Sequence, residues 1–134
     1  MLTKDEIVRL AKSHGIEPYQ EEKRYIQNAV LSALYREIGP ALVFKGGTSL
    51  FLLQGLDRYS EDLDFTAAGH ASAEDVIAAV QNVCHSLNIQ AQVRSRDSTA
   101  GITVNVNAQG PLFSSPPSVC SVRVEISTRN DLLL

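Results

Sequence analysis

The sequence predicts one α+β domain, in which a mixed, mostly antiparallel sheet has its helices packed on one side. Two helical patterns open the chain, strand-like and helical segments then alternate, and the last third is almost entirely strand-like. Helices and strands that are segregated in this way are typical of α+β domains. A length of 134 residues suits one domain, and 44% hydrophobic residues are enough to build its core.

Two helices are predicted before the first strand. Thr3 and Glu6 have the spacing of a capping box, and apolar residues at helical spacing follow until Gly15. The next helix is predicted over about 19–38, where apolar residues recur at steps of three and four. Its open face carries too few basic or amide residues for a helix-turn-helix reader of DNA. We therefore expect both helices to cover the core, and we expect no specific binding of duplex DNA.

The middle of the chain alternates between strands and helices. Residues 41–44 (ALVF) are predicted as a short buried strand, and residues 48–54 (TSLFLLQ) as a buried helix. Polar and apolar residues alternate in 61–66 (EDLDFT), which predicts a strand. A second capping pattern, from Ser72 to Asp75, begins a helix that we expect to reach about residue 88.

The remaining residues are strand-like. β-branched residues with period-two alternation predict strands over 89–94, 101–107 and 119–127. Turn residues separate these strands, and 114–118 (SSPPS) is expected to form a loop.

Composition excludes several classes of protein. A net charge of −3 argues against non-specific coating of nucleic acid, because that binding depends on neutralising phosphates. The net charge does not exclude a local basic patch, for which the candidate residues are Arg94, Arg96, Arg123 and Arg129. Cys84 and Cys120 fit no metal or redox spacing and are interpreted as reduced core thiols. The sequence has no signal-peptide pattern and no membrane-length apolar run, so we expect a cytoplasmic protein without a membrane partner.

The run Lys45-Gly46-Gly47-Thr48-Ser49 connects a predicted strand to a predicted helix. Glycines let the backbone approach a ligand closely, and the free N–H groups at a helix start favour a phosphate. Thr48 or Ser49 can add a hydroxyl donor. The same run also suits a tight turn in which one of these hydroxyls caps the helix. Its spacing differs from that of a Walker A loop.

Two carboxylates, Asp62 and Asp64, share one face of a predicted strand. Like charges this close are unfavourable unless something neutralises them, and Mg²⁺ with substrate phosphates would do so. A solvated acidic edge strand is the alternative. The segment 49–61, 13 residues long, has room for a helix and a return that bring the glycine run to the same end of the sheet. Arg58 and Ser60 flank this predicted site. They either contact phosphate or have no role in it, in which case Arg58 is a surface cation and Ser60 a turn residue.

One further acid lies in the last strand. In 122–126 (VRVEI), Arg123 and Glu125 share the face opposite the aliphatic residues. A lone acid in an apolar strand needs a partner when it is buried. Glu125 is therefore either a third metal ligand beside the aspartates or the partner of an arginine such as Arg123.

The segments GGTSL, RYSEDLDF and VRVEIS together resemble the nucleotidyltransferase AbiEii/AbiGii toxin family, within the DNA polymerase beta-like nucleotidyltransferase superfamily. The resemblance is strongest over 43–66, is weaker at 119–129 and is only architectural in the first helices. It implies a nucleotidyltransferase-like core over 1–134. Family members continue into a helical C-terminal domain, and this chain ends on three leucines, so we expect it to be truncated before that domain.

The resemblance implies the transfer of a nucleoside monophosphate from an NTP, with two Mg²⁺ ions, to an RNA such as a tRNA end or to a protein. The implied catalytic residues and metal ligands are Asp62, Asp64 and Glu125, with Glu125 as ligand or base. The implied phosphate-binding residues are Lys45, Gly46, Gly47, Thr48, Ser49, Arg58, Ser60 and Arg123. The resemblance also implies a toxin of a toxin–antitoxin or phage-defence pair, with a cognate antitoxin. The alternative is a catalytically inert remnant that binds nucleotide or protein.

Overall fold

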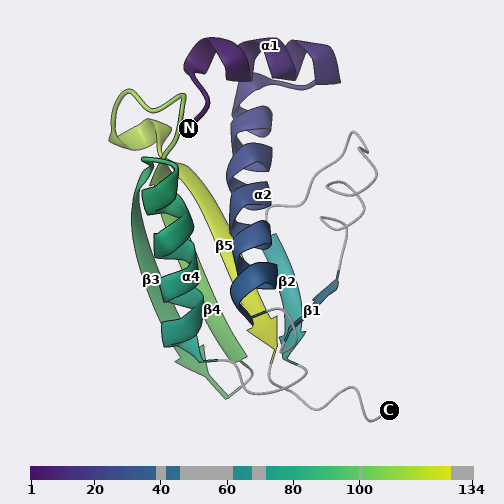
Figure 1. Cartoon of the computed structure of the whole chain (residues 1–134), viewed down its shortest axis with the longest axis vertical. Coiled ribbons are helices and arrows are strands. Elements are labelled where there is room, and N and C mark those ends of the chain that lie inside the picture. The colour runs from purple at the N-terminus through teal and green to yellow at the C-terminus, as the bar shows by residue number, and fades with distance from the viewer. Residues whose placement is uncertain (39–41, 46–61, 68–71, 100, 128–134) are drawn as a thin grey trace.

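A computed structural model of the chain describes residues 1–38, 42–45, 62–67, 72–99 and 101–127 (Figure 1). The helices are α1 (Lys4–His14), α2 (Pro18–Ile38) and α4 (Ala73–Ser86), with a short 3₁₀ turn over Pro116–Ser118. The strands are β1 (Leu42–Lys45), β2 (Asp62–Ala67), β3 (Gln90–Ser98), β4 (Gly101–Gln109) and β5 (Cys120–Ser127). The predicted helix at 48–54 lies outside the described residues.

The five strands form one mixed sheet in the order β1-β2-β5-β4-β3. Among the described strands, β2 and β5 pair in parallel, and the other three neighbouring pairs are antiparallel. Figure 1 shows α2 and α4 side by side on one face of this sheet, and both contact its strands. The predicted α+β fold, with a mixed, mostly antiparallel sheet and helices on one side, is therefore confirmed.

Alternation along β5 decides which residues enter the core. Val122, Val124 and Ile126 are buried toward α2 and α4, whereas Arg123 and Glu125 point to the opposite face. We call this opposite face, turned away from α2 and α4, the far face. Burial of an aliphatic side chain of this size contributes about 1.5–3 kcal/mol. The apolar positions therefore fix which charged residues appear on the far face.

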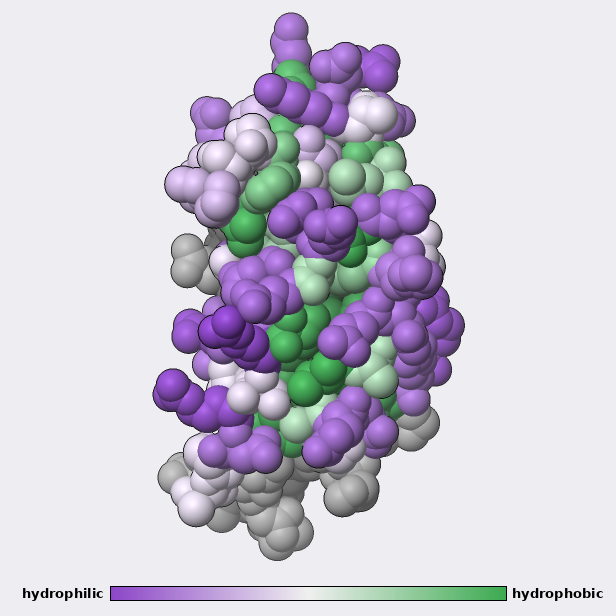
Figure 2. All heavy atoms as spheres, turned by 90° about the vertical axis from the view of Figure 1, so that its left-hand side faces the viewer, coloured by the Kyte–Doolittle hydropathy of each residue, from purple (hydrophilic) through white to green (hydrophobic). Residues whose placement is uncertain are grey.

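The edge of this core is visible from the side of β3 and α4. Figure 2 shows a stripe of hydrophobic atoms on this side, with hydrophilic side chains along both of its borders. Ile77 of α4 and Ala91 and Val93 of β3 are partly buried against the core here. β3 is thus an edge strand with one apolar and one polar face.

Local capping explains where the helices begin and end. The Thr3 hydroxyl accepts from the Glu6 N–H at 3.2 Å, and the Glu6 carboxylate accepts from the Thr3 N–H at 2.9 Å, which confirms the capping box. Gly15 ends α1 in the left-handed conformation, with φ 71°. The Ser72 hydroxyl accepts from the Asp75 N–H at 3.2 Å, the first bond of the second predicted box.

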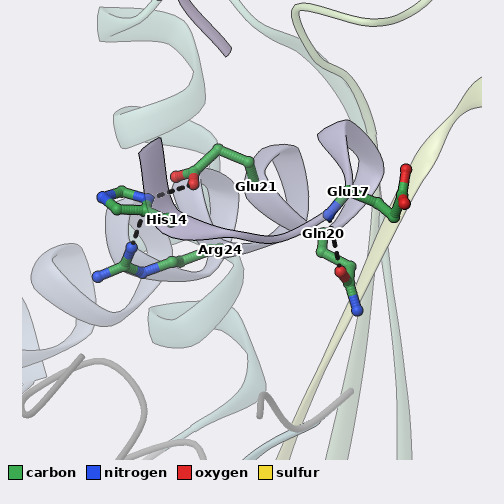
Figure 3. Close-up of polar contacts among 5 residues, drawn as sticks. All are labelled: His14, Glu17, Gln20, Glu21 and Arg24. Carbon is green, nitrogen blue, oxygen red and sulfur yellow. Dashed lines mark hydrogen bonds and ion pairs between the residues drawn. The ribbon is translucent and has the colours of Figure 1, made fainter. Parts of the chain in front are cut away.

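Polar contacts fix the turn between α1 and α2 (Figure 3). The Nδ1 atom of His14 lies 2.5 Å from Oε1 of Glu21 and 3.1 Å from Nη1 of Arg24. Nearby, the Gln20 side-chain oxygen accepts from the Glu17 N–H at 2.9 Å. Glu21 is buried, so this contact with His14 gives its carboxylate a partner in the interior.

Two strands of the C-terminal third, β3 and β4, run further than predicted, and β5 agrees with its prediction to within one residue. β3 extends to Ser98 rather than to residue 94, because its polar end pairs with β4 along the whole hairpin. Cys84 and Cys120 are both free and buried, which confirms them as core thiols. Burial raises the pKa of the Cys120 thiol to about 12, so the thiolate is scarce at neutral pH. None of the helices among the described residues has the length and apolar character needed to cross a membrane.

Candidate metal centre

Parallel pairing of β2 and β5 brings three carboxylates together on the far face. Leu63 and Phe65 of β2 are buried in the core, so Asp62 and Asp64 lie on the other side of that strand. The register places Asp64 opposite Glu125. One carboxylate oxygen from each of Asp62, Asp64 and Glu125 lies within 4.8 Å of the other two. The predicted pair of aspartates and the acid from the last strand therefore form one cluster.

The electrostatics of this cluster favour a bound cation. Burial, followed by the negative charge of Asp62, raises the pKa of the Glu125 carboxyl above its ordinary value. Asp64 acts in the same direction, whereas the charge of Arg123 opposes the shift. A carboxyl whose pKa is raised by its acidic neighbours indicates crowded negative charge, which a divalent ion would relieve.

Arg123 already provides one positive charge at the cluster. Its Nη2 donates to Oδ2 of Asp62 at 3.0 Å, and its Nε donates to Oδ1 at 3.2 Å. The same Nε lies 3.6 Å from Oε1 of Glu125. The two interpretations that the sequence left open for Glu125 are therefore both present, because it lies beside the aspartates and beside an arginine. Arg123 holds Asp62 through two parallel bonds, a geometry that fixes the carboxylate plane.

The chemistry of the donor set fits a hard divalent ion. All three groups offer carboxylate oxygens, which are the ligands that Mg²⁺ prefers. The side chains of Asp62 and Glu125 are 23% and 43% exposed, so a substrate can reach the cluster from solvent. Three ligands from the protein leave further coordination positions for oxygens of a substrate.

The predicted phosphate-binding residues are only partly covered by the described chain. β1 pairs with β2 so that Lys45 lies opposite Asp64, and the strand that leads into the glycine run therefore ends beside the carboxylates. The remaining residues of this set lie outside the described residues, so their roles stay predictions: Gly46, Gly47, Thr48, Ser49, Arg58 and Ser60.

A pocket next to the cluster contains residues that the sequence did not single out. It has a volume of about 210 Å³ and is lined by Lys23, Asp62, Asn105, Ser121, Val122 and Arg123. Lys23 comes from α2, and no motif in the sequence marked it as a site residue. Asn105 and Ser121 come from β4 and β5. The pocket thus joins a lysine from the helix layer to the acidic cluster on the sheet.

Two solved structures from Helicobacter pylori have a similar fold. One, described as a "putative nucleotidyltransferase", is 22% identical with a TM-score of 0.61, and the match covers 81% of this chain and 44% of that chain. The other, JHP933, is 22% identical with a TM-score of 0.63, and the match covers 85% of this chain and 45% of that chain. The match therefore covers less than half the length of either protein. No curated protein matches it.

The sequence itself matches a family model over residues 30–133, which include β2, β5 and all three carboxylates. This family is described as the nucleotidyl transferase AbiEii toxin of type IV toxin–antitoxin systems. The matched range is well over half of the 134 residues, and it agrees with the resemblance of the sequence motifs. The chain therefore belongs to the AbiEii nucleotidyltransferase toxin family, with the nucleotidyltransferase fold of its structural neighbours.

Proposed function

We propose that this protein is a Mg²⁺-dependent nucleotidyltransferase that moves a nucleoside monophosphate from an NTP to an acceptor hydroxyl on an RNA, such as a tRNA end, or on a protein. The observation that carries the proposal is the carboxylate cluster of Asp62, Asp64 and Glu125, in a chain of a nucleotidyltransferase family.

The reaction requires the acceptor oxygen to attack the α-phosphorus while the bond to the leaving pyrophosphate breaks. Two bound Mg²⁺ ions would activate the attacking oxygen and stabilise the departing pyrophosphate. Asp62, Asp64 and Glu125 would hold these ions on the far face. Glu125 would act either as a ligand of these ions or as the base that takes the proton from the acceptor hydroxyl. The glycine run after Lys45 would hold the triphosphate through its backbone N–H groups.

The family also supports a biological role for the protein. We infer that it acts in the cytoplasm as the toxin of a toxin–antitoxin or phage-defence pair, and that a cognate antitoxin protein binds it. Antitoxin control is expected of the type IV toxin–antitoxin systems to which the family belongs.

Labelling with an α-phosphate-labelled NTP tests the proposal in the full-length protein. Asp62→Asn and Asp64→Asn should each abolish the NTP-dependent labelling of cellular RNA or protein, because each removes a charge that holds the ions. Asp97→Asn is the matched control. Asp97 is an exposed acid of β3 that lies opposite Ile102 in the register, on the face of the sheet that does not carry the cluster. Retained labelling by both site variants would overturn the assigned roles.

Calorimetry separates the enzyme from an inert remnant of such an enzyme. We expect the full-length protein to bind NTP with Mg²⁺ and to release pyrophosphate when an acceptor is present. Binding without release of pyrophosphate would indicate a nucleotide-binding remnant instead, and no binding of any NTP would indicate a module that binds only a protein partner.

A further inference from the structure

The far face of β3 and β4 carries a polar surface that leads directly to the carboxylate cluster. Strand register aligns Arg94, Asn105, Arg123 and Asp62 in one row across four strands. The neighbouring row contains Arg96, Thr103, Glu125 and Asp64 in the same order. Each row therefore begins with an arginine on the edge strand β3 and reaches an aspartate on β2, and the second row continues to Lys45 of β1.

The charge on this surface changes sign along each row. Arg94 and Arg96 are exposed, and the far-face positions of β3 and β4 carry no acidic residue. The acids gather on β2 and β5 instead. Neighbouring strands lie about 4.8 Å apart, so Arg94 is roughly 14 Å from Asp62, which is three strand spacings. A polyanion lying on the arginines would thus approach the cluster without crossing another acid.

The surface also continues into the pocket beside the cluster. Asn105 and Arg123 belong to the first row and line the pocket, together with Lys23. Ser121 also lines the pocket, and its hydroxyl donates to the side-chain oxygen of Asn107 beside the pocket at 2.7 Å, which orders these two polar side chains. Positive and amide side chains therefore extend from the β3 edge to the entrance of the site.

The chemistry of this surface favours a nucleic acid backbone over a protein. Protein interfaces are anchored by aromatic side chains and arginines in well-packed, desolvated pockets, whereas the far-face positions of β3 and β4 contain no aromatic or aliphatic residue and the arginines there are exposed. Base stacking needs aromatic platforms, which are absent from the same positions. Guanidinium, amide and hydroxyl groups are donors for phosphate oxygens, and such contacts position a nucleic acid without reading its sequence.

We propose that Arg94, Arg96, Thr103 and Asn105, named the phosphate strip, bind the phosphodiester backbone of a single-stranded polynucleotide and lead its end to the carboxylate cluster. A single strand fits because the strip ends at a pocket of about 210 Å³. The inference rests on the proposed function for the reaction at the end of the strip, but binding to the strip requires neither NTP nor metal.

Fluorescence anisotropy with a short labelled RNA of mixed sequence tests the strip, in EDTA and without NTP. The variant R94Q/R96Q should bind roughly tenfold more weakly than wild type, and the dependence of log K on log salt should fall by about 0.7 for each lost phosphate contact. R94K/R96K should retain most of the affinity, because it keeps both charges. R9Q/R36Q is the matched control, since it removes the same charge from exposed positions on α1 and α2.

Several results would overturn the phosphate strip. The first is that R94Q/R96Q and wild type bind the RNA with equal affinity. The second is that R9Q/R36Q loses as much RNA affinity as R94Q/R96Q. The third is that the wild-type protein binds polyglutamate but not RNA. Circular dichroism of each variant separates lost binding from lost folding. Failure of the proposed function is a different observation, namely wild-type protein that binds the RNA but shows no binding of NTP with Mg²⁺.

Discussion

The Arg123 side chain competes for the same oxygens that a metal ion would need. Both carboxylate oxygens of Asp62 accept from Arg123, at 3.0 and 3.2 Å. A divalent ion on Asp62 must therefore displace or share these bonds, and it also meets a positive charge at short range. The guanidinium offsets part of the negative charge of the cluster in the absence of metal. The phosphate contact that the resemblance implies for Arg123 stays a prediction.

Replacement of this arginine should therefore strengthen metal binding. We expect Arg123→Gln to bind Mn²⁺ about three- to tenfold more tightly than wild type, since a nearby like charge is removed. Calorimetry or the spin-resonance signal of free Mn²⁺ measures this affinity without any turnover. Arg36→Gln, which removes an exposed charge from α2, is the control. Weaker binding in R123Q would show that Arg123 orients Asp62 for the metal rather than competing with it.

The residues of the site differ in how far the sequence could predict them. Alternation within one strand is a local property, so the shared face of Asp62 and Asp64 followed from five or six letters of sequence. The meeting with Glu125 was one of two open interpretations, because it depends on which strand lies beside β2. Lys23 and Asn105 escaped prediction, since their place at the pocket depends on packing between elements distant in the sequence.

At the scale of elements, Glu22 ties α2 to the loop after β4. Its carboxylate is buried and accepts from the Leu112 N–H at 2.7 Å. Burial raises the pKa of Glu22 above its ordinary value, and the hydrogen bond only partly opposes this shift. A carboxyl with a raised pKa in the folded state favours folding most at low pH, and this contribution is lost as the pH rises through the folded pKa.

Glu22→Gln should therefore stabilise the protein at neutral pH. Glutamine keeps an oxygen that can accept from Leu112 but carries no buried charge. In urea denaturation at pH 7 the variant should unfold at higher urea than wild type. The difference should shrink as the pH falls below the ordinary carboxyl pKa of 4.5. A variant less stable than wild type at pH 7 would show that the charge strengthens the bond more than burial penalises it.

Gly101 begins β4 at a point where no side chain fits. Its φ is 152°, and a Cβ atom there would lie 2.0 Å from the backbone oxygen of Ile126. Gly101→Ala should cost about 2–4 kcal/mol of unfolding free energy, because backbone strain and a clash with β5 add. Gly15→Ala is a matched comparison, since Gly15 also has a positive φ but no atom near its Cβ position. It should cost only about 1 kcal/mol. Equal losses in thermal or urea unfolding would argue against the clash.

Elements with local signals were predicted well, and their pairing was not. Capping residues and helical spacing gave α1 and α2 to within a residue or two, because these features depend on neighbours in sequence. The strands were recognisable from alternation. Their order was not, because β5 enters the sheet between β4, which precedes it closely in the chain, and β2, which lies more than fifty residues earlier. This insertion is the step that creates the carboxylate cluster.

At the scale of the whole molecule, one face of the sheet builds the core and the other collects charge. The three acids of the cluster lie on the neighbouring strands β2 and β5, so folding itself brings them together. Part of the free energy of folding is therefore spent on holding like charges close to each other. Arg123 offsets some of this repulsion, and a bound divalent ion should offset more.

Metal binding should consequently stabilise the entire fold. A ligand that binds only the folded state, at a hundred times its dissociation constant, adds about 2.7 kcal/mol, which raises Tm by several degrees in a domain of this size. Mg²⁺ or Mn²⁺ should therefore raise the Tm of wild type in thermal denaturation.

Glu125→Gln removes one of the crowded charges. Without metal, this variant should therefore unfold at a higher temperature than wild type, and its Tm should rise little when metal is added. Asp97→Asn, with its acid outside the cluster, should respond to metal as wild type does. Equal metal-induced shifts in E125Q and wild type would show that the ion binds elsewhere, and the cluster would then lose its role as the metal centre.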